Sequence, residues 1–265
     1  MATDVQPATS PLSGQVLLYV NPEPLDSARH AKLGMMRSDR PFSFAGKQHF
    51  VPLHVGEFAP AALNYPIIFA GDQRAPLAVM GVNPGENLFI SDDGVFRTGA
   101  YVPAFIRRYP FVVARDQAMD RMVVCIDRSF HLFSETNPDV PLFEDGEPTA
   151  FTKSCIDFCS QFDADAQTTQ AFVKLLTDLD LFDTRQTTFT PRAADGTAGE
   201  PQLIAEYYAV SEEKLKALPA EKLAELRDNG ALSQIYAHLI SLLGWDRLIL
   251  QTVERNNLAA QAANA

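Results

Sequence analysis

Short apolar runs separated by proline and glycine dominate the first half of the chain. Runs of this length, bounded by turn-forming residues, are typical of β-strands. The pattern predicts strands at Gln15–Val20, Phe50–Leu53, Pro66–Ala70, Leu77–Val82, Phe111–Ala114 and Met122–Ile126. Asp92-Asp93-Gly94 separates two apolar pairs and predicts a hairpin turn, because glycine tolerates the positive φ that such a turn requires.

Two short helices are predicted between these strands. Glu57–Asn64 is rich in alanine and ends before Tyr65-Pro66, and Pro103–Tyr109 begins with a proline at a first-turn position. Its last residue precedes Pro110, which disfavours a helical conformation there. We expect Pro66–Ala70, Leu77–Val82 and Phe111–Ala114 to pair in one largely buried sheet.

The second half of the chain has mainly helical spacing. Apolar residues recur every three or four positions in Phe151–Phe162, Thr168–Asp180 and Ala231–Leu243, which predicts helices there. A further short helix is predicted at Leu248–Val253. Burial is expected for Leu232, Ile235, Leu239 and Leu243. Ser211 is a good N-cap ahead of two acidic residues, Pro219 starts another helix and Gly230 ends it. Thr188–Thr190 and Leu203–Val210 resemble strands, with Asp195-Gly196 in the loop between them.

These elements predict an α+β fold in a single domain, with a mostly antiparallel sheet in the N-terminal half and helices concentrated in the C-terminal half. The domain is expected to span residues 14–255, sheet-rich over 14–150 and helix-rich over 151–255. Residues 1–13 and 256–265 are polar or rich in Ala, Asn and Gln, so we expect flexible ends.

Composition and charge narrow the function classes. The chain has 265 residues and a formal net charge of -11. A nucleic-acid-binding surface needs a basic face, so no nucleic-acid partner is expected. No apolar run is long enough for a membrane span, and the polar N-terminus does not resemble a secretory signal, which together predict a cytoplasmic protein. Cys155 and Cys159, four residues apart, are interpreted as small buried apolar side chains on one helix face.

The strongest candidate binding residues are two adjacent arginines near tyrosines. Arg107 and Arg108, with Tyr101 and Tyr109 close in sequence, could hold a carboxylate or phosphate. The alternative is that they are structural braces. One would then pair with Asp116, Asp127 or Glu86 while the other is solvated. Neighbouring helical positions point about 100° apart, so two adjacent arginines rarely serve one ligand together.

Other candidates are weaker. Asp127 follows an apolar run and is expected at a strand end, and Asn87 lies in a glycine-containing turn. An alternative is a metal site formed by His49, His54 and Glu57, joined by His131 or His238. The chain contains no nucleophile-elbow, phosphate-loop or dinucleotide-binding motif, so no catalytic residues and no cofactor are predicted.

Several runs in the same order resemble the SapC family. They are Tyr65-Pro66-Ile67, Gly85-Glu86-Asn87-Leu88-Phe89, Tyr101-Val102-Pro103, Arg107-Arg108-Tyr109-Pro110-Phe111, Cys125-Ile126-Asp127, Leu142-Phe143-Glu144-Asp145-Gly146-Glu147, Gly230-Ala231-Leu232 and Tyr236-Ala237-His238-Leu239. The Arg-Arg-Tyr-Pro-Phe run is the most specific of them. The family name comes from a bacterial surface-layer association, and the resemblance implies an accessory protein without an established catalytic set.

The residues and the resemblance together predict a SapC-like bacterial accessory protein that binds a protein partner or a small anionic ligand. One alternative is a non-haem iron oxygenase-like enzyme, or a helper in oxidative modification, built around His54. Another is a surface-layer component. Surface association would then require a non-classical export route, because no secretory signal is seen.

Overall fold

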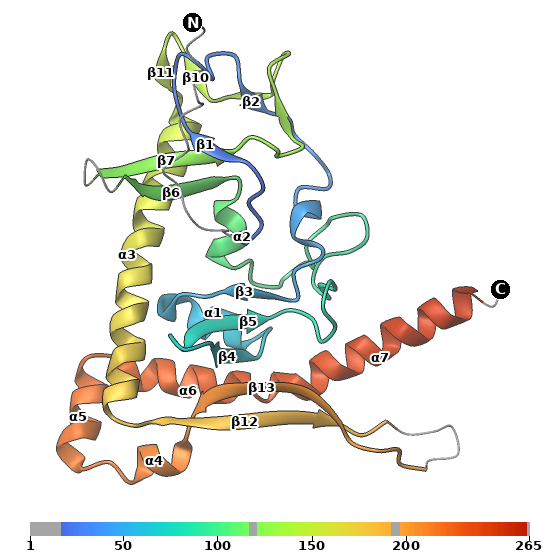
Figure 1. Ribbon diagram of the computed structural model, residues 1–265, viewed down its shortest axis with the longest axis vertical. Coiled ribbons are helices and arrows are strands. Elements are labelled where there is room, and N and C mark those ends of the chain that lie inside the picture. The colour runs from blue at the N-terminus through green and yellow to red at the C-terminus, as the bar shows by residue number, and fades with distance from the viewer. Residues whose placement is uncertain (1–16, 117–120, 192–196, 264–265) are drawn as a thin grey trace, which may run out of the picture. The chain divides into compact units, whose positions relative to one another are not determined.

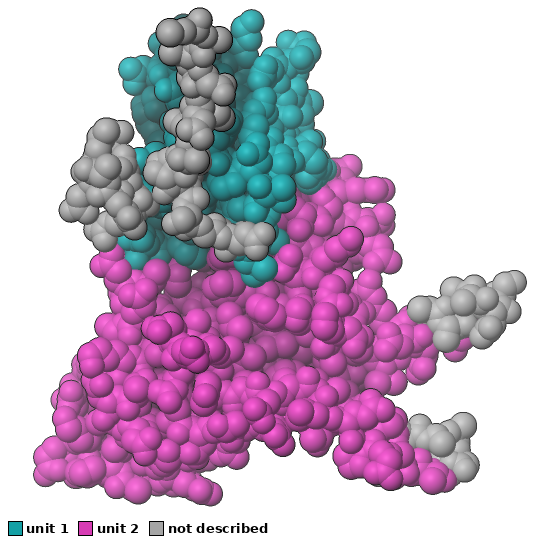
Figure 2. All heavy atoms as spheres, viewed as in Figure 1, with its two compact units in different colours: residues 1–38, 108–163 teal, residues 39–107, 164–265 magenta. Residues whose placement is uncertain are grey.

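The computed structural model describes residues 17–116, 121–191 and 197–263. The expected flexible segment 1–13 and the Asp195-Gly196 loop lie outside the described residues. The chain divides into two compact units, one of residues 1–38 and 108–163 and the other of residues 39–107 and 164–265 (Figure 2). Helix α3 (Ala150–Asp178) supplies its first part to unit 1 and its second part to unit 2.

The described residues of unit 1 form three small antiparallel sheets. The strands are β1 (Pro22–Pro24), β2 (Gly34–Met35), β6 (Phe111–Asp116), β7 (Arg121–Asp127), β8 (Phe133–Ser134), β9 (Val140–Pro141), β10 (Phe143–Glu144) and β11 (Glu147–Pro148). The sheet orders are β1-β7-β6, β8-β2-β9 and β10-β11. The peptide bond between Tyr109 and Pro110, just before β6, is cis.

The β6–β7 pair places apolar side chains on both of its faces. Phe111 opposes Ile126 and Val112 opposes Cys125. The first pair belongs to a cluster that also contains Leu33, Leu142 and Cys159, whereas the second packs with Tyr19. Since successive residues of a strand point to opposite faces, this uninterrupted apolar run fills two clusters at once.

The three cysteines contribute to these clusters as apolar side chains. Cys155 packs against the cluster that contains Cys159, in agreement with their spacing on one helix face. Burial raises the pKa of the Cys125 and Cys159 thiols to about 11 and that of Cys155 to about 12. All three are therefore protonated at neutral pH.

Unit 2 is built on a five-stranded antiparallel sheet of order β12-β13-β4-β5-β3 (Figure 1). The strands are β3 (Phe50–Pro52), β4 (Ile67–Ala70), β5 (Ala75–Val79), β12 (Phe182–Phe189) and β13 (Gln202–Val210). The helices are η1 (Ser43–Ala45), η2 (Val55–Glu57), α1 (Phe58–Ala62), α2 (Ala104–Arg108), α4 (Glu212–Lys216), α5 (Ala220–Asp228), α6 (Ala231–Ser241) and α7 (Gly244–Ala263). Helix α2 crosses the boundary between the units: its residues 104–107 belong to unit 2 and its last residue, Arg108, belongs to unit 1.

Polar side chains of α6 fasten this helix to the sheet. The buried His238 accepts a hydrogen bond at Nε2 from the Val210 amide, at 3.1 Å, and its Nδ1 lies 2.9 Å from the Ile67 carbonyl oxygen. Ser241 Oγ accepts a hydrogen bond from the Ile67 amide at 2.9 Å. Only Tyr208 and Phe69 pair directly between β13 and β4, so His238 continues the ladder across this narrow junction.

The α+β class, the antiparallel pairing and the concentration of helices in the second half are confirmed. The single-sheet expectation is wrong, because β4 and β5 pair in unit 2 while β6 lies in a sheet of unit 1. The predicted strand Gln15–Val20 is also wrong where it is described, since residues 17–20 form turns and bends. Leu243 is 79% exposed rather than buried, whereas Ile235 is buried as expected.

Two helix predictions need different bounds. Phe151–Phe162 and Thr168–Asp180 are parts of one helix, α3, because the intervening residues contain alanine and no glycine or proline to stop it. The short helix expected at Leu248–Val253 is a segment of the 20-residue α7. The Ser211 N-cap is confirmed, since its side chain accepts a hydrogen bond from the Lys214 amide. No helix among the described residues combines the length and hydrophobicity needed to cross a bilayer.

Candidate functional site

The two candidate arginines do not form one site. Arg107 is exposed on α2, where its Nε donates a hydrogen bond to the Val102 carbonyl at 3.0 Å and an NH2 group donates to the Tyr101 hydroxyl at 3.2 Å. Arg108 is buried, and its guanidinium lies 4.0 Å from the ring centre of Phe162. Arg107 belongs to unit 2 and Arg108 to unit 1.

A buried carboxylate organises the Tyr101 side of α2. Glu57 Oε1 accepts hydrogen bonds from the Tyr101 hydroxyl at 2.9 Å and from the Ala104 amide at 2.7 Å, and Oε2 accepts one from the His54 amide at 2.9 Å. Burial, helped by the negative charge of Glu57, raises the pKa of Tyr101 to about 12. The Tyr101 hydroxyl therefore keeps its proton and serves as a donor that joins α2 to η2.

Asp127 is the corresponding hub of unit 1. It is fully buried, and its carboxylate accepts hydrogen bonds from the amides of Val20, Asn21 and Ser129 and from the Ser129 hydroxyl at 2.6 Å. The Tyr109 hydroxyl lies 3.3 Å from Oδ2. Burial alone would raise the pKa of Asp127, but these hydrogen bonds outweigh it and lower the pKa below its usual value.

Asn87 and the histidines have local structural contacts. Asn87 is buried, and its Oδ1 accepts a hydrogen bond from the Phe89 amide at 2.9 Å, as expected for a turn residue. His49 packs edge-on to the Phe50 ring, and burial lowers the pKa of His49. Among the residues that the structure describes, no three His, Cys, Asp or Glu side chains come together as metal ligands would.

A ligand-sized cavity of about 670 Å³ lies in unit 2, beside the second part of α3. We call it the Arg74 pocket. Its walls come from the β4–β5 turn, the segment after β3 and one face of α3: Pro52, Leu53, His54, Asp72, Gln73, Arg74, Ala75, Pro76, Ala166, Thr169, Gln170, Val173, Lys174, Thr177 and Asp178. This volume falls within the usual range for small-molecule sites, about 300–1,000 Å³.

Arg74 is held in place at this pocket by stacking and one hydrogen bond. Its guanidinium lies 5.0 Å from the ring centre of Phe182 and 5.1 Å from that of Tyr208, and NH1 donates to the Thr177 hydroxyl at 3.1 Å. Within the described part of the chain, no carboxylate forms an ion pair with Arg74, whose remaining N–H groups can therefore bind a ligand oxygen.

The other charges at the pocket nearly cancel. Lys174 Nζ contacts both carboxylate oxygens of Asp178, at 2.9 and 2.8 Å, one turn along α3. Asp72 lies in the same turn as Arg74. With two basic and two acidic side chains in the lining, Arg74 is the cation whose charge a ligand can still use.

Sequence reasoning missed the Arg74 pocket. Gly71 and Arg74 both have positive φ, and the Arg74 amide donates to the Gly71 carbonyl, so Arg74 is fixed in a tight turn between β4 and β5. The signal available in the sequence was Gly71-Asp72, a pair of turn-forming residues between two predicted strands, which places Arg74 at a turn. Nothing in the local sequence shows that this turn meets α3. No lining residue of the Arg74 pocket lies between Tyr101 and Tyr109.

The fold and the pocket define an α+β protein of antiparallel sheets with a ligand-sized cavity beside a long helix. The SapC family model matches residues 25–248, and the chain therefore belongs to the SapC family. Comparison with curated proteins and with solved structures gave no match.

Proposed function

We propose that this SapC-family chain is an accessory protein that binds a small carboxylate-bearing ligand in the Arg74 pocket. The observation that carries the proposal is Arg74 itself, a stacked guanidinium at a ligand-sized cavity without a carboxylate partner among the described residues. A planar guanidinium matches a carboxylate through two parallel hydrogen bonds. Stacking on two rings fixes its orientation before the ligand arrives.

The remaining walls favour an apolar body on this ligand. Leu53, Pro76 and Val173 are buried and line the cavity beside the polar end formed by Arg74 and Thr177. Apolar walls with a few well-placed polar groups are typical of small-molecule sites. A short aromatic or branched aliphatic acid has both parts.

The charges favour a monoanion over a polyphosphate. Lys174 is already paired with Asp178, and Asp72 adds a negative charge to the pocket. The whole chain has a net charge of -11, which opposes the approach of a multiply charged anion. A ligand with a single carboxylate neutralises Arg74 and brings no further negative charge.

The proposal can be tested by titration with 2-naphthoate and its neutral analogue 2-naphthamide. The wild-type chain should bind 2-naphthoate and should bind the amide more weakly. Arg74→Gln should weaken 2-naphthoate binding roughly tenfold to hundredfold, the value of hydrogen bonds to a charged group.

Arg107→Gln is the matched control. Arg107 is also an arginine of unit 2, and its change removes the same charge from the chain at the position that the sequence favoured. It should leave 2-naphthoate binding within about twofold of wild type, because electrostatic effects at a distance are screened by salt. Equal losses in both variants, or loss in Arg107→Gln alone, would contradict the proposed site.

A protein partner is a second candidate, favoured by one exposed apolar face. Tyr236 and Ile240 lie four residues apart on α6, and Leu243 follows just after the end of this helix at Ser241; the three are 44%, 59% and 79% exposed. Residues four apart share one side of a helix. Ile240→Glu should remove a partner that co-purifies with the wild-type chain, whereas Lys222→Glu on α5 should retain it. Equal recovery with both variants would argue against this face.

A further inference from the structure

The Arg74 pocket offers a negative charge as well as the Arg74 guanidinium. Asp72 lines the cavity from the turn between β4 and β5. Among the described residues, its carboxylate forms no ion pair and accepts no hydrogen bond. The other acidic lining residue, Asp178, contacts Lys174 through both of its carboxylate oxygens. In this lining, all of which the structure describes, a ligand can therefore still use one cation and one anion.

The two charges lie close together in the chain and stay separate. The Arg74 amide donates a hydrogen bond to the Gly71 carbonyl at 3.0 Å, which closes a tight turn around Asp72 and Arg74. In the described structure of this turn, the two side chains form no ion pair with each other. The guanidinium lies instead against the rings of Phe182 and Tyr208, 5.0 and 5.1 Å from their centres. Both charges of the turn are thus available to one small molecule.

A zwitterionic ligand matches this arrangement. An α-amino acid carries its carboxylate and its ammonium group on the same carbon atom, so the protein groups that bind them must lie close together. One tight turn meets this requirement with Arg74 and Asp72. An ammonium group has three N–H donors. Gln73 and Gln170, two lining residues whose amide groups have no hydrogen-bond partner among the described residues, can accept the donors that Asp72 does not.

The side chain of the ligand has an apolar wall to contact. Leu53, Pro76 and Val173 are buried and line the same cavity. We infer that the Arg74 pocket binds an α-amino acid with an apolar side chain, whose carboxylate pairs with Arg74 and whose ammonium group pairs with Asp72. This inference rests on the proposed carboxylate site and adds a second charged contact to it. A zwitterion has no net charge, so the net charge of -11 does not oppose its approach.

The matched probes are L-phenylalanine and 3-phenylpropanoate, which share the ring and the carboxylate and differ in the α-ammonium group. The third probe, 2-phenylethylamine, keeps the ammonium group and lacks the carboxylate. In ligand-observed NMR titrations, the wild-type chain should bind L-phenylalanine about twofold to fivefold more tightly than 3-phenylpropanoate, the range expected for one exposed ion pair. The amine should bind most weakly, because it has no carboxylate for the Arg74 guanidinium.

Asp72→Asn tests the ammonium contact. It should weaken L-phenylalanine binding about twofold to fivefold and should not weaken 3-phenylpropanoate binding, because only the amino acid has a group that pairs with the carboxylate. Asp246→Asn is the matched control, since it removes the same charge from an exposed position of unit 2 outside the pocket lining. It should preserve the difference between the two acids, because charges at a distance are screened by salt.

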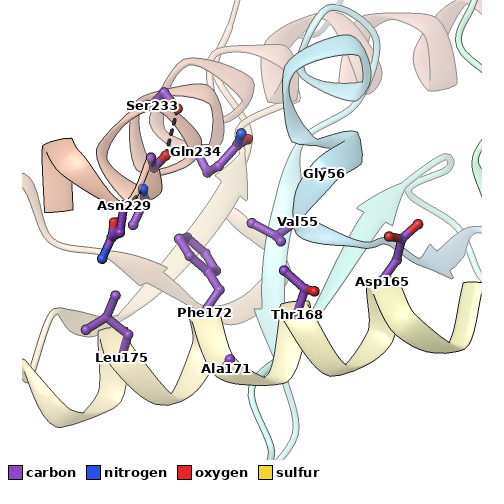
Figure 3. Close-up of a pocket in the computed structure, with 12 residues that line it drawn as sticks. Val55, Gly56, Asp165, Thr168, Ala171, Phe172, Leu175, Asn229, Ser233 and Gln234 are labelled. Atoms are coloured by element: carbon purple, nitrogen blue, oxygen red, sulfur yellow. Dashed lines mark hydrogen bonds between the residues drawn. The ribbon is translucent and has the colours of Figure 1, made fainter. Parts of the chain in front are cut away.

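Two tryptophan variants of α3 locate the ligand. Gln170 lines the Arg74 pocket, whereas the adjacent Ala171 lines a second cavity of unit 2, about 480 Å³, on a different face of the helix (Figure 3). Gln170→Trp should abolish the binding of both acids, and Ala171→Trp should preserve it. Circular dichroism checks the fold of each variant. If Gln170→Trp does not fold, Arg74→Gln locates the site instead, because it should weaken the binding of both acids.

The outcomes distinguish this inference from the carboxylate site on which it rests. If neither acid binds, both are wrong. If 3-phenylpropanoate binds and Arg74→Gln weakens its binding, but L-phenylalanine binds no more tightly, the carboxylate site is supported and the amino-acid inference is overturned. The inference is also overturned if Asp72→Asn keeps the full preference for L-phenylalanine, or if a folded Gln170→Trp variant binds this amino acid as well as the wild type does.

Discussion

Protonation of His238 should weaken unit 2 in a defined pH range. His238 is fully buried between α6 and the sheet, where Nε2 accepts from the Val210 amide and Nδ1 lies against the Ile67 carbonyl. This geometry fits the neutral tautomer with its proton on Nδ1. Burial lowers the pKa of His238 from 6.5 to about 4, because the imidazolium loses its hydration.

The sign and size of the effect follow from linkage. Below pH 6.5 the unfolded chain takes up a proton that the folded chain refuses until about pH 4. The free energy of unfolding therefore decreases as pH falls through this window. At about 1.4 kcal/mol for each pH unit, the contribution of His238 between pH 7 and pH 4.5 is about 2.5 kcal/mol.

Urea denaturation at pH 7 and pH 4.5 measures this contribution. His238→Gln should lower stability at pH 7, but it should lose about 2.5 kcal/mol less than the wild type on acidification. His131→Gln, which changes an exposed histidine, should retain the wild-type pH dependence. If His238→Gln keeps the full pH dependence, the neutral buried role assigned to His238 is wrong.

Three further substitutions test the polar contacts by urea denaturation at pH 7. Glu57→Gln should lower the free energy of unfolding by about 2 kcal/mol, because only one of the two terminal atoms of glutamine can accept a hydrogen bond. A loss below about 0.5 kcal/mol would contradict the role of the Glu57 carboxylate in holding α2. Asp127→Asn should lower the free energy of unfolding by about 2–3 kcal/mol for the same reason. Wild-type stability in this variant would refute the stabilising role of the Asp127 carboxylate. Thr169→Val should lower the free energy of unfolding by about 1–3 kcal/mol, since Thr169 Oγ1 accepts a hydrogen bond from the Val55 amide at 3.0 Å. Unchanged stability would show that this hydrogen bond does not stabilise the chain.

Local structure was predictable where the signals are local. The turn glycine of Asp92-Asp93-Gly94 has a φ of +72°, and the flanking Ile90 and Phe96 form an antiparallel bridge. Ser211 caps α4 as its hydroxyl and the following acids indicated. Each of these features depends on residues close together in the chain.

The assignment of strands to sheets was not predictable in this way. β4 joins β5 through a short turn, but its other neighbour is β13, more than a hundred residues later. β6 has an apolar pattern similar to that of β4, yet it pairs with β7 and β1 in unit 1. Period-two patterning shows that a segment is a strand and which faces it buries, but it does not identify the partner.

The candidate site depended on the same long-range information. The sequence favoured Arg107 and Arg108 because they are adjacent, whereas the structure exposes the first and buries the second against Phe162. The Arg74 guanidinium is positioned by aromatic rings on β12 and β13 and by a hydroxyl on α3. The burial of Arg108 and the stacking of Arg74 therefore could not be predicted from their neighbours in the chain.

A crystal structure of the chain with 2-naphthoate would show whether Arg74 binds the carboxylate. We expect the ring system to lie between Leu53, Pro76 and Val173, with the carboxylate within hydrogen-bonding distance of the Arg74 guanidinium, at about 2.7–2.9 Å. A carboxylate bound at Arg107 and Tyr101, with the Arg74 pocket empty, would contradict the proposed site.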